Sequence, residues 1–286
     1  MKLGISSYSL FQAINKGEMD IFDVLDWVKE IGGEHLELVP MGFDFIETPA
    51  LITQVKEKAS SLGVDLSNYA IGANFICETD EAFEQEIERV KQHVDIAYQL
   101  GVKFMRHDIA NRDAHERTLD QFMSDLPKLV EACQRIADYA KDKGIVTSIE
   151  NHGYYVQSSD RVQAIVQQVN RENFRTTLDI GNFLCFDENP LTAVKNNLSI
   201  ASVVHLKDFY YRQDKVTRFG GWFSTHFGNQ LRGAILGHGD LPVPEIIEVI
   251  KASSFDGYVT IEFEGVEECR FASKASFDFA KKLLFV

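Results

Sequence analysis

The segment Ile145-Val146-Thr147-Ser148-Ile149-Glu150-Asn151-His152-Gly153 has the pattern of a buried strand that ends on a polar cluster. Apolar and β-branched residues fill its first half, as in parallel strands that are covered on both faces. Glu150 then stands at the carboxyl end of the strand, where parallel sheets and barrels keep their catalytic groups. The segment therefore predicts both a strand and one residue of a functional site.

Three later segments repeat this design, because each is a short apolar or β-branched run that ends on a potential metal ligand. They are residues 174–178 before Asp179, residues 202–204 before His205, and residues 258–261 before Glu262. Any one such carboxylate alone is more readily explained as a helix cap or a salt-bridge partner. Carboxylates packed together repel one another, however, and a cation relieves that repulsion. We therefore predict a metal site made of Glu150, Asp179, His205 and Glu262, whose oxygen-rich set suits Mn²⁺, Mg²⁺, Co²⁺ or Zn²⁺.

The rest of the chain alternates between strand-like and helical segments. Further strands are expected at residues 3–8, 35–39, 64–70 and 102–106, and helices at about 20–30, 48–62, 80–100, 119–143, 160–170, 190–197, 244–252 and 271–284. Eight strands alternating with about eight helices predict an α/β protein with a (β/α)8 TIM barrel. An open doubly wound sheet is the alternative, but Ser6-Ser7-Tyr8 stands where its glycine fingerprint is needed. No linker or composition break divides residues 1–286, so we expect a single domain.

Composition narrows the class of protein and its partners. The net charge of −14 disfavours nucleic acid as a partner, and no apolar run approaches the length of a membrane span. The first residues lead into a strand without the pattern of a signal peptide. Four scattered cysteines are typical of free thiols in a reducing compartment. We expect a cytoplasmic protein with no membrane partner, and the sequence leaves a homo-oligomer open.

Five motifs carry a resemblance to a known family. They are Ser148–Gly153 (SIENHG), Thr177–Phe183 (TLDIGNF), Val204–Asp208 (VHLKD), Leu236–Asp240 (LGHGD) and Tyr258–Glu262 (YVTIE). Together they resemble the xylose isomerase-like TIM barrels of the sugar phosphate isomerase/epimerase superfamily, and they span the second half of the chain. The resemblance implies that the four predicted ligands hold one divalent metal ion, for which we expect Mn²⁺, and that Glu150 and Glu262 are the catalytic acid/base pair.

The activity implied by this resemblance is the isomerisation or epimerisation of a small sugar or keto-sugar in carbohydrate metabolism. A metal polarises the carbonyl and stabilises an enediolate, while a glutamate that gives the metal one oxygen keeps the other for the proton. An inosose-type dehydratase, which expels water from the same intermediate, is the alternative within the superfamily. An endonuclease IV-like DNA repair enzyme is less favoured because Asn182 replaces a required histidine. A non-catalytic sugar-binding protein is disfavoured by the two intact glutamates.

The same end of the barrel supplies the expected substrate contacts, namely His107, His152, Asn182, Lys207 and Arg218. Asn182 stands where ketose 3-epimerases usually carry a histidine. Arg218 belongs to a long segment after His205, rich in glycine and aromatic residues, that is expected to be irregular as far as Leu241 and to act as a lid. For Glu37, at the end of the second strand, a sugar-hydroxyl acceptor and a plain salt bridge both remain open.

Overall fold

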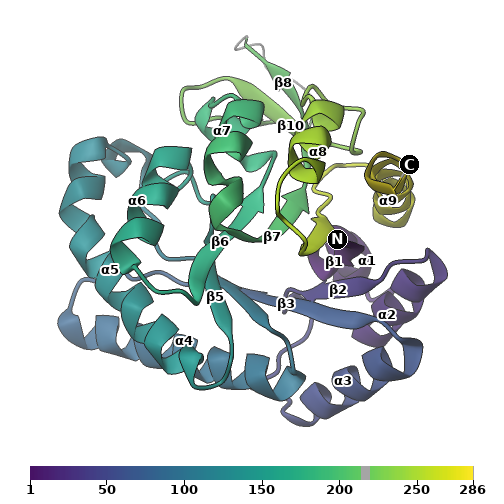
Figure 1. Cartoon of the computed structure of the whole chain (residues 1–286), viewed down its shortest axis with the longest axis horizontal. Coiled ribbons are helices and arrows are strands. Elements are labelled where there is room, and N and C mark those ends of the chain that lie inside the picture. The colour runs from purple at the N-terminus through teal and green to yellow at the C-terminus, as the bar shows by residue number, and fades with distance from the viewer. Residues whose placement is uncertain (214–219, 286) are drawn as a thin grey trace.

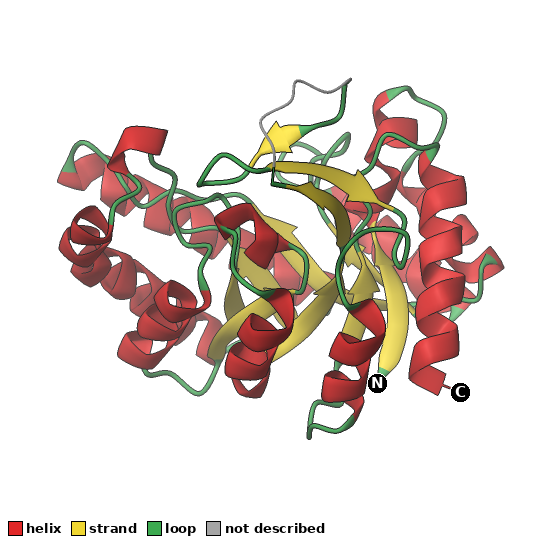
Figure 2. Ribbon diagram, turned by 90° about the horizontal axis from the view of Figure 1, so that it is seen from above, coloured by secondary structure: helices red, strands yellow, loops and turns green. Residues whose placement is uncertain are grey.

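Eight parallel strands close into a barrel in the computed structural model, which describes residues 1–213 and 220–285. In their order around the ring they are β1 (Lys2–Ser6), β11 (Tyr258–Ile261), β7 (Ala201–Leu206), β6 (Phe174–Asp179), β5 (Val146–Glu150), β4 (Phe104–His107), β3 (Asp65–Ile71) and β2 (His35–Leu38). Figure 1 shows the helices outside this ring and Figure 2 shows the barrel from above. The predicted (β/α)8 fold is confirmed.

The outer layer is built of helices that follow the strands along the chain. The α-helices of the described residues are α1 (Phe11–Asn15), α2 (Ile21–Glu30), α3 (Ala50–Leu62), α4 (Asp80–Leu100), α5 (Leu119–Lys141), α6 (Ser159–Val169), α7 (Pro190–Asn197), α8 (Val243–Lys251) and α9 (Cys269–Phe285). Their apolar faces and the outward-facing residues of the strands form one continuous hydrophobic core. The core therefore lies between the two layers, which leaves the inside of the barrel to other side chains.

Local sequence signals set the helix ends. Asp20 accepts hydrogen bonds from the backbone N–H groups of Phe22 and Asp23, and the Asp23 carboxylate accepts one from the Asp20 backbone N–H, so α2 begins with a complete capping box. Gly101 ends α4 with a φ of 79°, a left-handed conformation that glycine adopts without strain. Such caps satisfy the free backbone groups of the helix ends and direct the chain into the next strand.

Polar side chains fill the inside of the barrel near the functional end. Ile149 and Leu178 are fully buried in the layer under the helices, whereas their strand neighbours point inward. The inward Ser148 and Thr177 hydroxyls lie 2.9 Å apart and are hydrogen-bonded across β5 and β6. This pair lies in the barrel interior one layer below the strand ends. The charged side chains of Glu150 and Asp179, two residues further along the same strands, therefore lie in the next layer.

The segment from His205 to Leu241 is predicted to be irregular, and this prediction is wrong for much of the part that the structure describes. Three short antiparallel strands form a second sheet with the order β8–β10–β9, namely β8 (Asp208–Arg212), β9 (Phe223–Ser224) and β10 (Gln230–Ala234). Figure 1 shows β8 and β10 beyond the end of β7. The strands escaped prediction because they are short and lack the apolar run of the barrel strands. The first barrel strand is also shorter than predicted, since a 3-10 turn (Ser7–Leu10) begins directly after Ser6.

Within the described ranges, no helix is both long and apolar enough to cross a membrane.

Candidate metal centre

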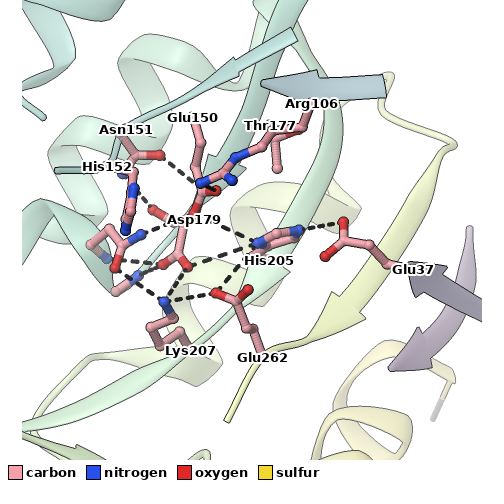
Figure 3. A network of polar contacts seen from close by, with 12 residues as sticks. Glu37, Arg106, Glu150, Asn151, His152, Thr177, Asp179, His205, Lys207 and Glu262 are labelled. Atoms are coloured by element: carbon pink, nitrogen blue, oxygen red, sulfur yellow. Dashed lines mark hydrogen bonds and ion pairs between the residues drawn. The ribbon is translucent and has the colours of Figure 1, made fainter. Parts of the chain in front are cut away.

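The four predicted metal ligands converge at the carboxyl end of the barrel (Figure 3). Glu150 and Asp179 are the last residues of β5 and β6, His205 lies in β7, and Glu262 follows β11 directly. One potential ligand atom from each lies within 4.8 Å of all the others. His205 Nδ1 is 3.7 Å from Glu150 Oε1, 3.9 Å from Asp179 Oδ2 and 3.6 Å from Glu262 Oε2. These separations exceed hydrogen-bond length and leave room for an ion among the donors.

The orientation of His205 is set by Glu37, the buried carboxylate of β2. His205 Nε2 lies 2.8 Å from Glu37 Oε2, so the ring donates its Nε2–H there and points Nδ1 toward the other three donors. Asn68 Nδ2 donates to the same Glu37 oxygen over 2.8 Å. Strands β2 and β3 are paired so that Glu37 lies opposite Asn68 after a register shift. This shift places both side chains on the inner face of the barrel. This carboxylate–histidine pair is the arrangement that commonly orients a metal-binding imidazole.

Asp179 is oriented by backbone groups. Its Oδ1 accepts hydrogen bonds from the N–H groups of Gly181 and Asn182, at 2.7 and 2.9 Å, which turns Oδ2 toward the centre. Residue 181 must be small, because a Cβ there would lie 2.8 Å from the carbonyl oxygen of Lys207. The TLDIGN sequence therefore folds so that Asp179 Oδ1 is held by the backbone and Asp179 Oδ2 is available to bind an ion.

The geometry fits a divalent cation. His205 Nδ1 and Asp179 Oδ2 are both fully buried and make no hydrogen bond. A buried polar atom without a hydrogen bond is costly, and the ion pair of Asp179 Oδ2 with Lys207 at 3.3 Å offsets only part of the repulsion among three carboxylates. An ion coordinated by three carboxylates and one imidazole satisfies these groups together, and this donor set suits hard or borderline divalent metals.

Asn151, the residue after Glu150, joins β5 to β6. Its Nδ2 donates to the backbone oxygen of Asp179 over 2.8 Å, and its Oδ1 accepts from the Asp179 N–H over 3.0 Å. Gln157 Nε2 in turn donates to the backbone oxygens of Asn151 and Asn182, at 2.9 and 2.6 Å. The amides hold the two carboxylate-bearing strand ends at a fixed separation, so this part of the ENHG motif is a positioning device.

Two buried cations, Arg106 and Lys207, neutralise part of the negative charge. Arg106 Nη2 lies 2.6 Å from Glu150 Oε2, and Lys207 Nζ lies 2.7 Å from Glu262 Oε2 and 3.3 Å from Asp179 Oδ2. Burial alone would raise the pKa of Glu150, but Arg106 and His205 outweigh it and lower that pKa to about 2. Burial likewise opposes ionisation of Glu262, yet Lys207 and His205 lower its pKa well below the usual value. Both glutamates are therefore held as carboxylates.

The pKa of Asp179 moves in the opposite direction. Burial raises it to about 6, and the nearby charges of Glu150 and Glu262 act in the same sense, against the attraction of Lys207. Lys207 itself has a pKa well above its usual value, because the surrounding carboxylates outweigh the burial that disfavours its charge. Burial lowers the pKa of His205, but Glu37 and Glu262 outweigh it and raise that pKa well above its usual value. The carboxylates therefore favour a positive charge at this point, and a bound ion would supply it in place of the Nδ1 proton.

A cavity of about 530 Å³ opens beside the donors. Its inner end is lined by Glu150, His205 and Glu262, and its walls include Tyr8 and Glu264. The volume falls within the range of small-molecule sites, roughly 300–1,000 Å³. A substrate in this cavity would therefore reach the metal ligands directly.

The family of the chain follows from a comparison with known sequences. A sequence profile described as xylose isomerase-like TIM barrel matches residues 25–283. This chain belongs to the xylose isomerase-like TIM barrel family. The resemblance inferred from the five motifs is thereby confirmed.

One curated relative and two solved structures are similar to this chain. An inosose dehydratase of Geobacillus thermodenitrificans is 21% identical over 228 residues, which are 74% of this chain and 74% of that protein. The structure of D-psicose 3-epimerase from Clostridium cellulolyticum H10 with D-tagatose has a TM-score of 0.75 at 17% identity and covers 99% of both chains. The IOLI protein with a bound zinc atom has a TM-score of 0.72 at 19% identity, covering 99% of this chain and 96% of that chain. At these identities the structural matches establish the shared fold.

The predicted substrate contacts of this family member differ in where the structure places them. His152 lines the cavity, and its Nδ1 lies 3.2 Å from Asp108 Oδ1. Asn182 Nδ2 donates to Glu150 Oε1 over 3.0 Å, and Lys207 Nζ lies 3.3 Å from Asn182 Oδ1. Asn182 and Lys207 thus contact the candidate metal donors, whereas His152 lines the cavity beside Asp108.

His107 and Arg218 are not brought there. His107 is fully buried beside the rings of Phe75 and Phe174, and its Nδ1 is bonded to the Asp108 backbone oxygen. It is absent from the cavity wall, where its strand neighbour Arg106 is present, because adjacent residues of a strand face opposite sides. Arg218 lies outside the described residues.

Glu37 and Arg106 are the site residues whose roles sequence reasoning missed. For Glu37 the sequence leaves a sugar-hydroxyl acceptor and a salt bridge open, because its partner His205 is 168 positions away. Arg106 is the last residue of the strand expected at residues 102–106 and stands next to His107. The available signal was alternation, since Arg106 and His107 cannot both face the barrel interior.

The LGHGD motif is structural in this member of the family. Asp208 accepts backbone hydrogen bonds from Gly237 and Gly239, both at 2.9 Å, and from Leu241 at 3.2 Å. A Cβ on Gly239 would lie within 2.1 Å of Asp208 Oδ1, so the approach requires glycine. The motif therefore connects the small sheet after β7 to the barrel end.

Proposed function

We propose that this protein is a divalent-metal-dependent isomerase or epimerase that acts on a small keto-sugar or related polyol. The reaction moves a proton through an enediolate, and Glu150 and Glu262 are the acid/base pair. The observation that carries the proposal is the placement of these two glutamates on either side of the β6–β7 ligand pair, each within 3.7 Å of His205 Nδ1. Two positioned carboxylates serve proton transfer, and binding alone does not require them.

The surroundings of the two glutamates suggest a division of labour. Glu262 uses Oε2 toward Lys207 and His205, while its Oε1 has no hydrogen-bond or ion-pair partner among the described residues. Glu150 has both oxygens engaged, because Oε2 binds Arg106 and Oε1 accepts from Asn182. We therefore assign the first removal of a C–H proton to Glu262, whose free oxygen can accept it, and the delivery of a proton at the second position to Glu150 or a group that it orients.

The metal proposed for the site is Mn²⁺, held by Glu150, Asp179, His205 and Glu262. When bound, such an ion polarises a substrate carbonyl and stabilises the negative charge that develops on its oxygen. The protein then contributes the orientation. Glu37 directs the imidazole, the Gly181 and Asn182 N–H groups direct Asp179, and Lys207 and His152 face the cavity as donors to substrate oxygens.

The second candidate is a dehydratase that forms the same enediolate and then expels a hydroxyl group as water. A curated relative that this chain matches over 74% of its length bears the name inosose dehydratase. Lys207, hydrogen-bonded beside Glu262, is a donor that could assist a leaving hydroxyl. Both activities begin with the same removal of a proton. They differ only in the second step, which is the return of a proton in an isomerase or epimerase and the loss of a hydroxyl group in a dehydratase.

A deuterium-exchange screen tests both candidates. The Mn²⁺-loaded protein is incubated in D₂O with ketoses, inososes and keto acids, the metal is removed with a chelator, and the products are analysed by NMR. An epimerase leaves the carbonyl in place and incorporates deuterium at the inverted carbon beside it. An isomerase moves the carbonyl to the neighbouring carbon and incorporates deuterium at the former carbonyl carbon, and a dehydratase yields a product that has lost water. A metal-free sample and Glu262→Gln serve as controls. The absence of exchange with every compound, from protein that retains metal, would contradict the proposal.

A further inference from the structure

The wall of the cavity that comes from the first half of the barrel carries a second group of polar residues, away from the four metal donors. Arg89 and His93 of α4 line it together with Asp44 from the loop after β2, and Gly72 stands beside them at the end of β3. None of these residues belongs to the metal centre. What they could bind follows from the hydrogen bonds they already make.

Arg89 is held rigidly with one donor left over. Its Nε and one Nη2 hydrogen bind the two carboxylate oxygens of Glu86 at 2.8 and 2.9 Å, and the other Nη2 hydrogen binds the Gly72 oxygen at 2.7 Å. Nη1 lies 3.2 Å from His93 Nε2. A guanidinium has five N–H groups, so four are used and one on Nη1 remains for a ligand in the cavity.

His93 is uncharged in this arrangement. Arg89 has only donors, so His93 Nε2 accepts, and the ring proton is on Nδ1, 2.8 Å from the Tyr69 hydroxyl oxygen. Burial and the charge of Arg89 lower the pKa of His93 to about 4, in agreement with that tautomer. The Glu86–Arg89–His93–Tyr69 chain is therefore a fixed scaffold, and the positive charge of Arg89 is already balanced by Glu86.

Asp44 supplies the complementary acceptor. Its Oδ1 accepts from the backbone N–H groups of Ile46 and Glu47, at 2.6 and 3.1 Å, which anchors the carboxylate at the end of its loop. Its Oδ2 has no partner among the described residues, and Asp44 lines the cavity. The far wall thus offers one fixed N–H donor and one anionic acceptor whose charge is unbalanced.

We propose that Asp44 and Arg89 form a distal subsite that binds hydroxyl groups of an uncharged polyol or sugar and excludes a phosphate or carboxylate at that end of the substrate. A hydroxyl both donates and accepts, so it can satisfy Asp44 Oδ2 and the free Arg89 N–H. An anionic group would meet the Asp44 carboxylate, while Arg89 offers it little net attraction because Glu86 is paired to it. The inference rests on the proposed function and narrows its substrate class to neutral compounds.

Matched pairs of ligands test the subsite by binding. The change in melting temperature and the Kd are measured for D-fructose, D-psicose and D-tagatose and for their 6-phosphates, with the Mn²⁺-loaded wild type, Asp44→Asn and Glu47→Gln. Asp44→Asn keeps an oxygen for the two backbone donors and removes the charge. Glu47→Gln removes a charge from the same loop without touching the cavity wall, so it reports on net charge alone.

We expect the wild type to bind at least one neutral ketose about ten- to a hundredfold more tightly than its phosphate, the range of a hydrogen bond to a charged group. Asp44→Asn should reduce this preference by about tenfold, and Glu47→Gln should preserve it. Preference of the wild type for the phosphates, failure of every neutral ketose to bind, or an unchanged preference in Asp44→Asn would each overturn the subsite. Neutral binding without deuterium exchange would instead contradict the proposed function and leave the subsite standing.

Discussion

The two halves of the barrel contribute differently to the same site. The half made of β5, β6, β7 and β11 supplies all four candidate metal donors, each at or near the end of its strand. The half made of β1 to β4 supplies none of them, and its charged residues act on the donors instead, as Glu37 does on His205 and Arg106 on Glu150. The second half therefore carries the candidate metal donors, and buried charged residues of the first half orient or neutralise two of them.

The largest effects should come from removing a donor of the second half. His205→Ala deletes the imidazole, and Asp179→Asn turns an amide NH2 toward the centre because backbone N–H groups hold the remaining oxygen at the Oδ1 position. We therefore expect both variants to lose stoichiometric metal and all measurable turnover. Elemental analysis after Mn²⁺ reconstitution and dialysis measures the occupancy, and about one ion per chain is expected for the wild type. Asp138→Asn, on the exposed surface of α5, is the control. Full occupancy in either ligand variant would refute the assignment.

The acid/base pair should give the next largest effect. Glu150→Gln and Glu262→Gln keep one oxygen donor, so we expect most of the metal to remain while kcat falls by about 10²- to 10⁴-fold, the usual contribution of a general acid or base. Glu150→Gln should also lower the melting temperature, because its two oxygens accept from Arg106 and Asn182 and an amide N–H would oppose one of these donors. Wild-type rates in both variants on a confirmed substrate would eliminate the mechanism.

A substitution in the first half should act more weakly and through His205. The Glu37→Gln side chain can still accept a hydrogen bond from His205 Nε2, but it lacks the negative charge that makes the imidazole a stronger metal ligand. We therefore expect the affinity for the metal to fall by about 10- to 100-fold. A titration with a competing chelator measures this Kd, and Glu30→Gln at the exposed end of α2 controls for charge. An unchanged metal Kd would mean that the two halves are independent, contrary to the comparison above.

The asymmetry between the halves also explains how much could be predicted. Each candidate metal donor follows a run of apolar or β-branched residues, so Glu150, Asp179, His205 and Glu262 could be found from local pattern and from motifs of the family. Glu37 is the next-to-last residue of β2, but its role depends on a partner in β7 and on a register shift against β3. The small sheet after β7 and the Arg89 scaffold depend likewise on contacts between distant segments, which local periodicity does not contain.

The smallest effect we predict concerns the connection between the strands of the second half. Asn151 makes two hydrogen bonds to the backbone of Asp179, and both partners are buried. Asn151→Ala leaves a buried N–H and a buried C=O without partners, so it should lower the free energy of unfolding of the metal-free protein by about 1–3 kcal/mol. Urea unfolding measures this loss, and Asn196→Ala on the exposed face of α7 should stay within about 0.5 kcal/mol of the wild type.

Metal should reveal whether Asn151 stabilises the fold or the site. If the amide mainly positions Asp179, Asn151→Ala will also weaken Mn²⁺ binding, because the ion must then pull the two strand ends together. Saturating Mn²⁺ would then stabilise the variant less than the wild type at the same metal concentration, since stabilisation by a ligand grows with its concentration relative to Kd. Equal metal affinities with a reduced unfolding free energy would confine Asn151 to the fold. Unchanged values of both would show that the strand ends are held in place without it.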